Sequence, residues 1–252
     1  MPFVLSILVF FGSAPAPAAT VDLATLLGTP HGEMPFVRDT VVRHEALVPG
    51  TEFADLTTGV LYFASRNGAR SAETFQVFRE DGSATLADVT AAIETASRDS
   101  AIVFAPLVGS DFEELCGKMA EKPDTAFLVT LGEPGYTLSP LFTHCAARNI
   151  LFVTTLNPEL TGLGEYSSYG PLVRLATPGV DLEAPVAPGR TASFLSDAFG
   201  MGVAAGQLAE THRKNPNLKG AALLSAFLAS EPVLESLRGK VTGAKAVLKF
   251  EK

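Results

Sequence analysis

Short apolar runs alternate along the chain with segments in which apolar residues recur every three or four positions. The runs are typical of strands buried on both faces, and they cover residues 73–78, 101–105, 126–131, 150–156 and 172–176. The segments between them have the spacing of helices that pack by one face. Strands that alternate with helices predict crossover connections and a parallel sheet. We therefore expect an α/β domain with three layers, in which a mostly parallel, doubly wound sheet has helices on both faces.

Two of the predicted helices begin at recognisable capping residues. Thr85 is followed three positions later by Asp88, a pairing that favours a helix start at this point. Ser110 and Glu113 form the same kind of capping box for the next helix. That helix is expected to end before Pro123, because proline cannot continue the hydrogen-bond ladder.

The C-terminal part of the chain predicts helices rich in small residues. Residues 196–212 contain alanine and glycine at many positions, which indicates a helix packed tightly against its neighbours. A final helix pair is expected over 223–228 and 233–237. Residues 184–189 (APVAPG) are interpreted as a loop because of their prolines and glycine.

Composition supports a large core and excludes some classes of function. Of the 252 residues, 47% are hydrophobic and only 18% are charged, against about 25% charged in a typical soluble domain. The 19 Lys and Arg and 27 Asp and Glu give a formal charge of −8. An acidic chain without basic clusters argues against nucleic-acid binding. No apolar run reaches the roughly 18 residues of a spanning helix.

The sequence predicts no cofactor and no metal. It lacks the glycine-rich patterns that bind nucleotide phosphates, and its four histidines are far apart in the chain. Two cysteines, Cys116 and Cys145, are too few for a disulfide framework or a cysteine zinc site. Whether these two form a single bridge stays open, because the sequence does not give their geometry.

The N-terminus has two interpretations. Residues 3–11 (FVLSILVFF) are apolar, and residues 12–19 are small residues and prolines, the pattern of a secretory signal peptide. The same run also has the composition of a buried parallel strand. Residues 1–19 are therefore either a signal peptide or the first strand, and residues 20–252 form a single domain. The first alternative places the protein outside the cell or in the periplasm, and the second in the cytoplasm.

Several segments of residues 73–252 resemble the subtilisin-like serine peptidases, or subtilases, in order and spacing. Residues 166–171 (YSSYGP) are similar to the family's Phe-Ser-Asn-Tyr-Gly, and residues 176–182 (ATPGVDL) to its Ala-Ala-Pro-Gly-Val-Asp-Ile. Residues 126–135 (AFLVTLGEPG) resemble the strand that ends in the family's Ala-Ala-Gly-Asn motif. The resemblance implies the subtilisin-like α/β fold and a site for peptide ligands.

The resemblance also implies an Asp, His and Ser catalytic triad, which this chain matches only in part. The nucleophile position falls on Ser196, which is also a suitable N-cap for the helix that follows. The base position falls on Pro49, which has no proton to accept or donate. The acid position falls near Phe11 and Gly12, where the family's aspartate is missing.

Two further positions of the resemblance depart from the family. The oxyanion asparagine is replaced by Glu133, whose ionised carboxylate would repel a developing oxyanion. Pro106 lies in the strand that matches the family's substrate-binding segment and removes a backbone donor there.

These departures favour a homologue that has lost catalysis and acts by binding a peptide or another protein. The alternative is an active serine endopeptidase that uses Ser196 with a rearranged base such as His44 or His31. A third interpretation is a different hydrolase in which Glu133 is the acid or base. A decayed gene product with no selected role is the fourth.

Overall fold

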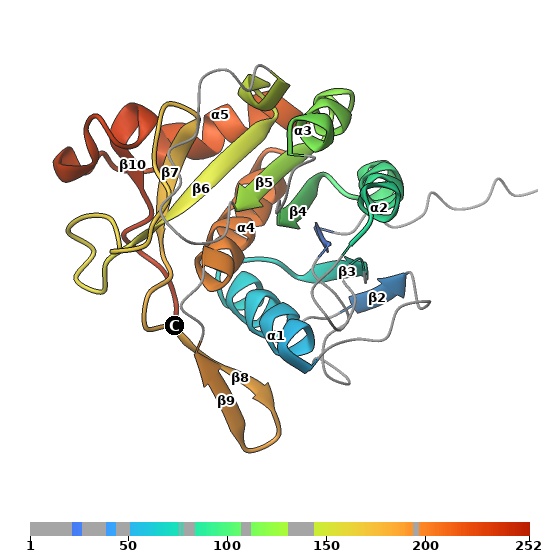
Figure 1. Cartoon of the computed structure of the whole chain (residues 1–252), viewed down its shortest axis with the longest axis horizontal. Coiled ribbons are helices and arrows are strands. Elements are labelled where there is room, and N and C mark those ends of the chain that lie inside the picture. Colours follow the sequence, from blue (N-terminus) through green and yellow to red (C-terminus); the bar gives the residue numbers. More distant parts are fainter. Residues whose placement is uncertain are drawn as a thin grey trace, which may run out of the picture.

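An eight-stranded sheet forms the centre of the computed structural model, which describes residues 22–26, 39–43, 51–75, 77, 84–106, 112–130, 144–193 and 197–252. The strand order is β10-β7-β6-β5-β4-β1-β3-β2, and all neighbouring strands are parallel (Figure 1). Their bounds are β1 (Leu23–Thr25), β2 (Asp39–Arg43), β3 (Ser71–Phe75), β4 (Ile102–Pro106), β5 (Ala126–Thr130), β6 (Ile150–Leu156), β7 (Val173–Pro178) and β10 (Lys245–Ala246).

Helices cover both faces of this sheet, so the domain has three layers (Figure 1). One face packs against α1 (Thr51–Arg66), α4 (Asp197–Lys214) and α5 (Gly220–Ser230). The other face packs against α2 (Leu86–Asp99) and α3 (Phe112–Ala120). The predicted fold class, a mostly parallel α/β sheet with helices on both faces, is confirmed.

Strand β6 shows why a continuous apolar run marks a central strand. Successive side chains of a strand point to opposite faces. Leu151 and Val153 accordingly lie in the cluster under α1, α4 and α5, whereas Ile150 and Phe152 lie in the cluster under α2 and α3. All seven residues of β6 are buried, and the predicted bounds, 150–156, are those observed.

The first strand of the chain, β1, is an interior strand of the sheet and does not come from the apolar run in residues 3–11. β1 occupies the place between β3 and β4, where Ala24 pairs with Glu73 on one side and Val103 on the other. The fold therefore has an interior first strand without the apolar run, which removes the main argument for reading that run as a strand. Residues 1–19 themselves lie outside the described residues, so their assignment stays a prediction.

The start of α2 agrees with the sequence, whereas Ser110, the predicted cap of α3, lies outside the described residues. The Thr85 hydroxyl accepts a hydrogen bond from the Asp88 amide at 3.1 Å, as expected of an N-cap. α3 ends at Ala120, before Pro123. The last predicted helix pair is one helix, α5, followed by a single 3₁₀ turn, η2 (Glu235–Leu237).

The prediction of a loop over residues 184–189 is wrong. Residues in this region form a two-stranded antiparallel hairpin of β8 (Glu183–Ala187) and β9 (Arg190–Ser193). Ala184 and Val186 point inward and are buried, which is the alternation of a strand with one buried face. Proline is tolerated here because both strands are edges, where a missing backbone donor breaks no ladder.

Helix α3 is fastened to the chain before β6 at three points along its length. Near its start, the Glu113 carboxylate accepts hydrogen bonds from the His144 amide at 3.0 Å and from its ring Nδ1 at 2.8 Å. Cys116 forms a disulfide with Cys145, with the two Cα atoms 4.9 Å apart. Beyond its end, the Asn149 amide donates to the carbonyls of Met119 and Lys122. The two cysteines are 29 positions apart in the sequence. Closing a loop of this length restricts the unfolded chain and thereby stabilises the folded state by about 3–4 kcal/mol.

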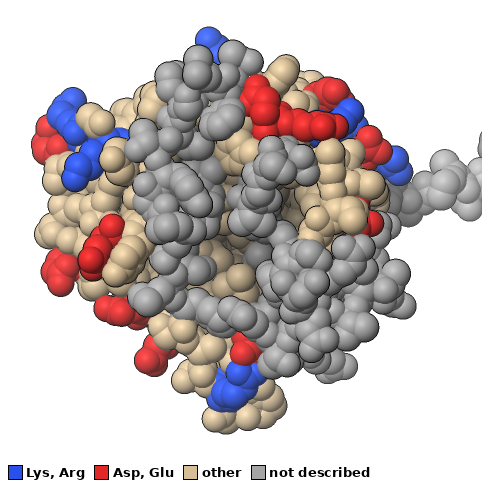
Figure 2. Space-filling view, viewed as in Figure 1, with Lys and Arg blue, Asp and Glu red and all other residues tan. Residues whose placement is uncertain are grey.

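On the face shown in Figure 2, charged side chains of both signs lie around the margin of the described residues. In the view of Figure 2, Lys and Arg form no continuous patch over the described residues. None of the helices within the described ranges is long and apolar enough to cross a membrane.

Helices α1 and α4 lie side by side and run in the same direction. Three contacts along them pair Gly59 with Phe199, Val60 with Gly202, and Ala64 with Gly206. The residue numbers rise together in both helices, which means that the helices are parallel. At each contact an added Cβ on the glycine would fall well inside van der Waals contact with the other helix, so the close approach requires glycine.

A Gly59→Ala substitution tests this packing. The new methyl group would overlap the Phe199 ring, and overpacking of this kind costs about 1–3 kcal/mol. We expect a lower free energy of unfolding in urea, with partial recovery when Phe199→Leu is added. Gly162→Ala is the matched control, because nothing lies within 4 Å of its Cβ position. Equal stability of Gly59→Ala and the wild type would show that the helices are not in close contact.

Candidate functional site

In open α/β folds, ligands bind outside the carboxyl ends of the parallel strands, which together form what we call the carboxyl edge of the sheet. In this protein the edge includes the ends of β4, β5 and β7 at Pro106, Thr130 and Pro178. α1 connects the carboxyl end of β2 to the beginning of β3, which is parallel to β2, so α1 begins at this edge. α4 is parallel to α1 and packs by its first turn against Pro178 at the end of β7, so it begins at the same edge. The edge therefore brings two helix beginnings and several strand ends together.

The first turn of α4 is held tightly at this edge. Gly200 lies against the carbonyl of Pro178 and the hydroxyl of Thr177, with no room for a side chain. Phe199 is fully buried and packs against Gly59 and against the ring of Phe63, with centroids 5.4 Å apart. The beginning of α4 is thus fixed against both β7 and α1.

Three of the predicted site residues are close in the sequence to described helices and strands. Pro49 is two positions before Thr51, the first residue of α1, and Ser196 directly precedes Asp197, the first residue of α4. Glu133 is three positions beyond Thr130, at the end of β5. Pro49, Glu133 and Ser196 themselves lie outside the described residues, as do Phe11 and Gly12. Their convergence in one cleft therefore stays a prediction.

Asp22, the carboxylate nearest to the first strand, lies at the opposite edge of the sheet. It precedes β1, and its Oδ2 accepts a hydrogen bond from the Arg70 amide at 2.8 Å. Its own amide donates to the Ser71 hydroxyl at 2.9 Å. Asp22 therefore joins the beginnings of β1 and β3 and is not available as the acid of a triad at the carboxyl edge.

Buried hydroxyls near the ends of β6 and β7 have structural partners. The Thr154 hydroxyl donates to the carbonyl of Ser168 at 2.5 Å, and the Ser167 hydroxyl to the carbonyl of Thr155 at 2.7 Å. The Thr177 hydroxyl donates to the carbonyl of Thr154 at 3.3 Å. These bonds hold the connection between the two strands in place. Each of the three hydroxyls donates its proton to a main-chain carbonyl.

One polar pair near this edge has no signal in the sequence. Asp55, in the second turn of α1, is bound by both terminal nitrogens of Arg190 on β9. The hydrogen bond to Asp55 raises the pKa of Arg190 above its ordinary value. The two residues are 135 positions apart, so no local pattern links them.

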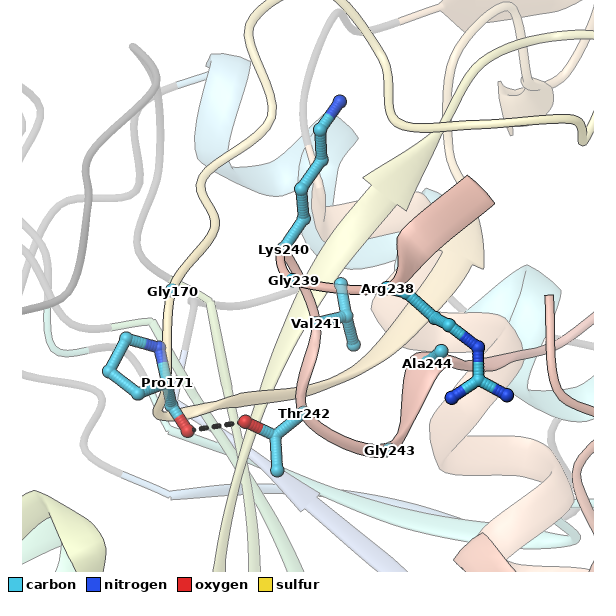
Figure 3. A pocket seen from close by; sticks show the side chains of 9 residues that line it. All are labelled: Gly170, Pro171, Arg238, Gly239, Lys240, Val241, Thr242, Gly243 and Ala244. Atoms are coloured by element: carbon cyan, nitrogen blue, oxygen red, sulfur yellow. Dashed lines mark hydrogen bonds between the residues drawn. The ribbon is translucent and has the colours of Figure 1, made fainter. Parts of the chain in front are cut away.

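A cavity of about 390 Å³ lies at the opposite edge of the sheet, near the amino-terminal end of β7. It is lined by residues 170–171, just before β7, and by residues 238–244. Figure 3 shows that the side chains of Arg238 and Lys240 extend in different directions, and that the Thr242 hydroxyl is bonded to the Pro171 carbonyl. Arg238 is paired with Glu235. The cavity therefore holds no convergent set of reactive groups, and it is separate from the candidate site.

Solved structures with the same fold are found among the subtilisin-like proteinases. A cold adapted subtilisin-like serine proteinase aligns with a TM-score of 0.70 and 15% sequence identity, over 91% of this chain and 88% of that chain. The subtilase cytotoxin SubAB, from a structure of its assembly, aligns with a TM-score of 0.66 and 16% identity, again over 91% and 88%. No protein-family model and no curated protein matches the chain.

At these identities the comparisons concern the fold. Each alignment spans 91% of this chain. They agree with the family resemblance of the sequence motifs in residues 126–182. The chain therefore has a subtilisin-like α/β fold, and this fold supports a relationship to the subtilases.

Proposed function

We propose that the protein is a subtilisin-like domain that has lost catalysis and acts by binding a peptide or another protein. The observation that carries the proposal is Pro49 in front of α1. The helix that begins at Thr51 matches the helix that carries the family's catalytic base. A general base must accept a proton from the nucleophile, and proline has no group that does so.

The acid position supports the same conclusion. The family's aspartate ends its first strand, and the first strand of this sheet is β1. We infer that the acid position lies in residues 26–28 (LLG) rather than near Phe11 and Gly12. Neither segment contains a carboxylate, so the triad lacks its acid in both interpretations. An imidazole at the base position would have no partner to orient it.

Glu133 stands where the family has the hydrogen-bond donor of the oxyanion site. An oxyanion site stabilises negative charge by donating hydrogen bonds, and an ionised carboxylate only accepts them. In subtilisin itself, the worked example for this effect, loss of one such donor costs about 10²–10³ in rate. Pro49, the missing acid and Glu133 together leave Ser196 without any of its catalytic partners, while the peptide-binding fold is retained.

Fluorescein-labelled, unfolded casein tests this function in two ways. We expect casein to bind with a saturable rise in anisotropy and to stay uncleaved, because the proposed domain keeps a peptide-binding edge but has no base to activate Ser196. A Ser196→Ala variant should bind with the same affinity as the wild type. Cleavage of casein by the wild type and not by Ser196→Ala would establish the alternative, an active endopeptidase. Failure of casein to bind would contradict the proposed peptide-binding function.

We further propose that the protein works in an oxidising compartment. The support is the Cys116–Cys145 disulfide, since such bonds persist mainly in secreted and periplasmic proteins. It favours the signal-peptide interpretation of residues 1–19, which end in small residues suited to a cleavage site. Intact-mass analysis of the protein secreted by its host is expected to show loss of about 19 residues at the N-terminus. A mature protein that still begins at Met1 would contradict this proposal.

A further inference from the structure

The β8–β9 hairpin projects from the body of the domain beside α1 (Figure 1). We propose that Arg190 and Asp55 are a positioning pair that fixes this hairpin on α1 and thereby sets how the chain enters α4. The consequence for ligand binding rests on the proposed function, because α1 and α4 begin at the edge assigned to the peptide. The positioning itself is a property of the described helices and strands.

The pair has the geometry of a specific connection. Arg190 Nη1 donates to Asp55 Oδ2 at 2.5 Å, and Nη2 donates to Oδ1, so the guanidinium and the carboxylate meet face to face. Two parallel bonds fix orientation as well as distance. The Asp55 side chain is only 9% exposed, whereas that of Arg190 is 45% exposed. A carboxylate buried to this degree depends on its partner, because an unpaired buried charge is strongly destabilising.

The described packing of the hairpin against the core is apolar. Its inward side chains are small: Ala184 and Val186 are buried, and Ala192 is partly buried against the same cluster. Small apolar surfaces contribute little burial energy, and their contacts are not directional. The ion pair therefore adds a directional contact between the hairpin and α1 to these apolar ones.

The hairpin leads directly into α4. β9 ends at Ser193 and α4 begins at Asp197, so four peptide units separate them, at most about 14 Å of chain. Asp55 is one turn of α1 before Gly59, against which Phe199 of α4 packs. α1 thus binds the first residue of β9 and the first turn of α4 at positions one turn apart, so that a shift of β9 reaches α4.

Hydrogen exchange measured by mass spectrometry tests the positioning. In Arg190→Met we expect amides of residues 183–193 to exchange at least about tenfold faster, and amides in the first turn of α4 to exchange faster as well. Arg190→Lys keeps the charge without the two-pronged geometry and should be intermediate. Asp55→Asn removes the buried charge and is the second variant if Arg190→Met does not fold. Wild-type exchange in both segments, in any folded variant, would overturn the proposal.

The matched control is Arg238→Met. Arg238 also binds a carboxylate through two nitrogens, but its partner Glu235 is three residues away and both side chains are exposed. We expect this variant to exchange like the wild type in residues 183–203. Faster exchange there in Arg238→Met would show that the effect is general destabilisation and would overturn the proposal.

Casein affinity separates a positioning role from a purely structural one. We expect casein to bind Arg190→Met at least about fivefold more weakly than the wild type, with Arg190→Lys partly restored and Arg238→Met unchanged. Unchanged affinity in a variant whose hairpin exchanges faster would show that the pair only stabilises the hairpin, against the proposal. If the wild type itself does not bind casein, the proposed function fails. The positioning role of Arg190 and Asp55 is then tested by hydrogen exchange in the first turn of α4 alone.

Discussion

The close approach of α1 and α4 is the constraint on which the candidate site depends. Glycine on one helix faces a bulky group or a main-chain carbonyl on the other at three successive contacts, so the two axes cannot separate or rotate freely. Because the helices are parallel, this contact holds their first turns at the same edge of the sheet. The hairpin before α4 is attached to the same helix by Arg190 and Asp55. α1 is thus the element against which the rest of the edge is placed.

The fold and the chemistry of this protein have separate origins in the sequence. The fold follows from the apolar residues that bury a parallel sheet on both faces, and it is shared with proteinases at only 15–16% identity. Catalysis in that family depends on a few polar side chains at the edge, and the fold does not require them. In the proposed function, Pro49 and Glu133 stand at positions where the family has catalytic groups.

The predictability of each element follows from how local its signal is. β6 is a seven-residue apolar run, and its bounds were predicted correctly. The start of α2 was predicted from the Thr85 cap, which is a local hydrogen bond. β1 has only three residues, so its signal is weaker than that of the apolar run in residues 3–11, although β1 is an interior strand of the sheet. The β8–β9 hairpin was missed because its prolines are typical of loops.

The candidate site was predicted only as positions in a family pattern. Pro49, Glu133 and Ser196 adjoin described elements at one edge, but their own placement is not part of the described structure. The pairing of Asp55 with Arg190 could not be predicted, because it is created by the packing of segments 135 residues apart. Long-range contacts of this kind require the fold before they can be recognised.

Covalent labelling with a fluorophosphonate probe tests most directly whether Ser196 has lost its activation as a nucleophile. The probe reacts with a serine only when a base and an oxyanion site activate it. We predict that the folded protein, analysed by intact mass and peptide mapping, carries no label at Ser196. Stoichiometric labelling of Ser196, absent after unfolding, would contradict the loss of catalysis and identify an active serine hydrolase.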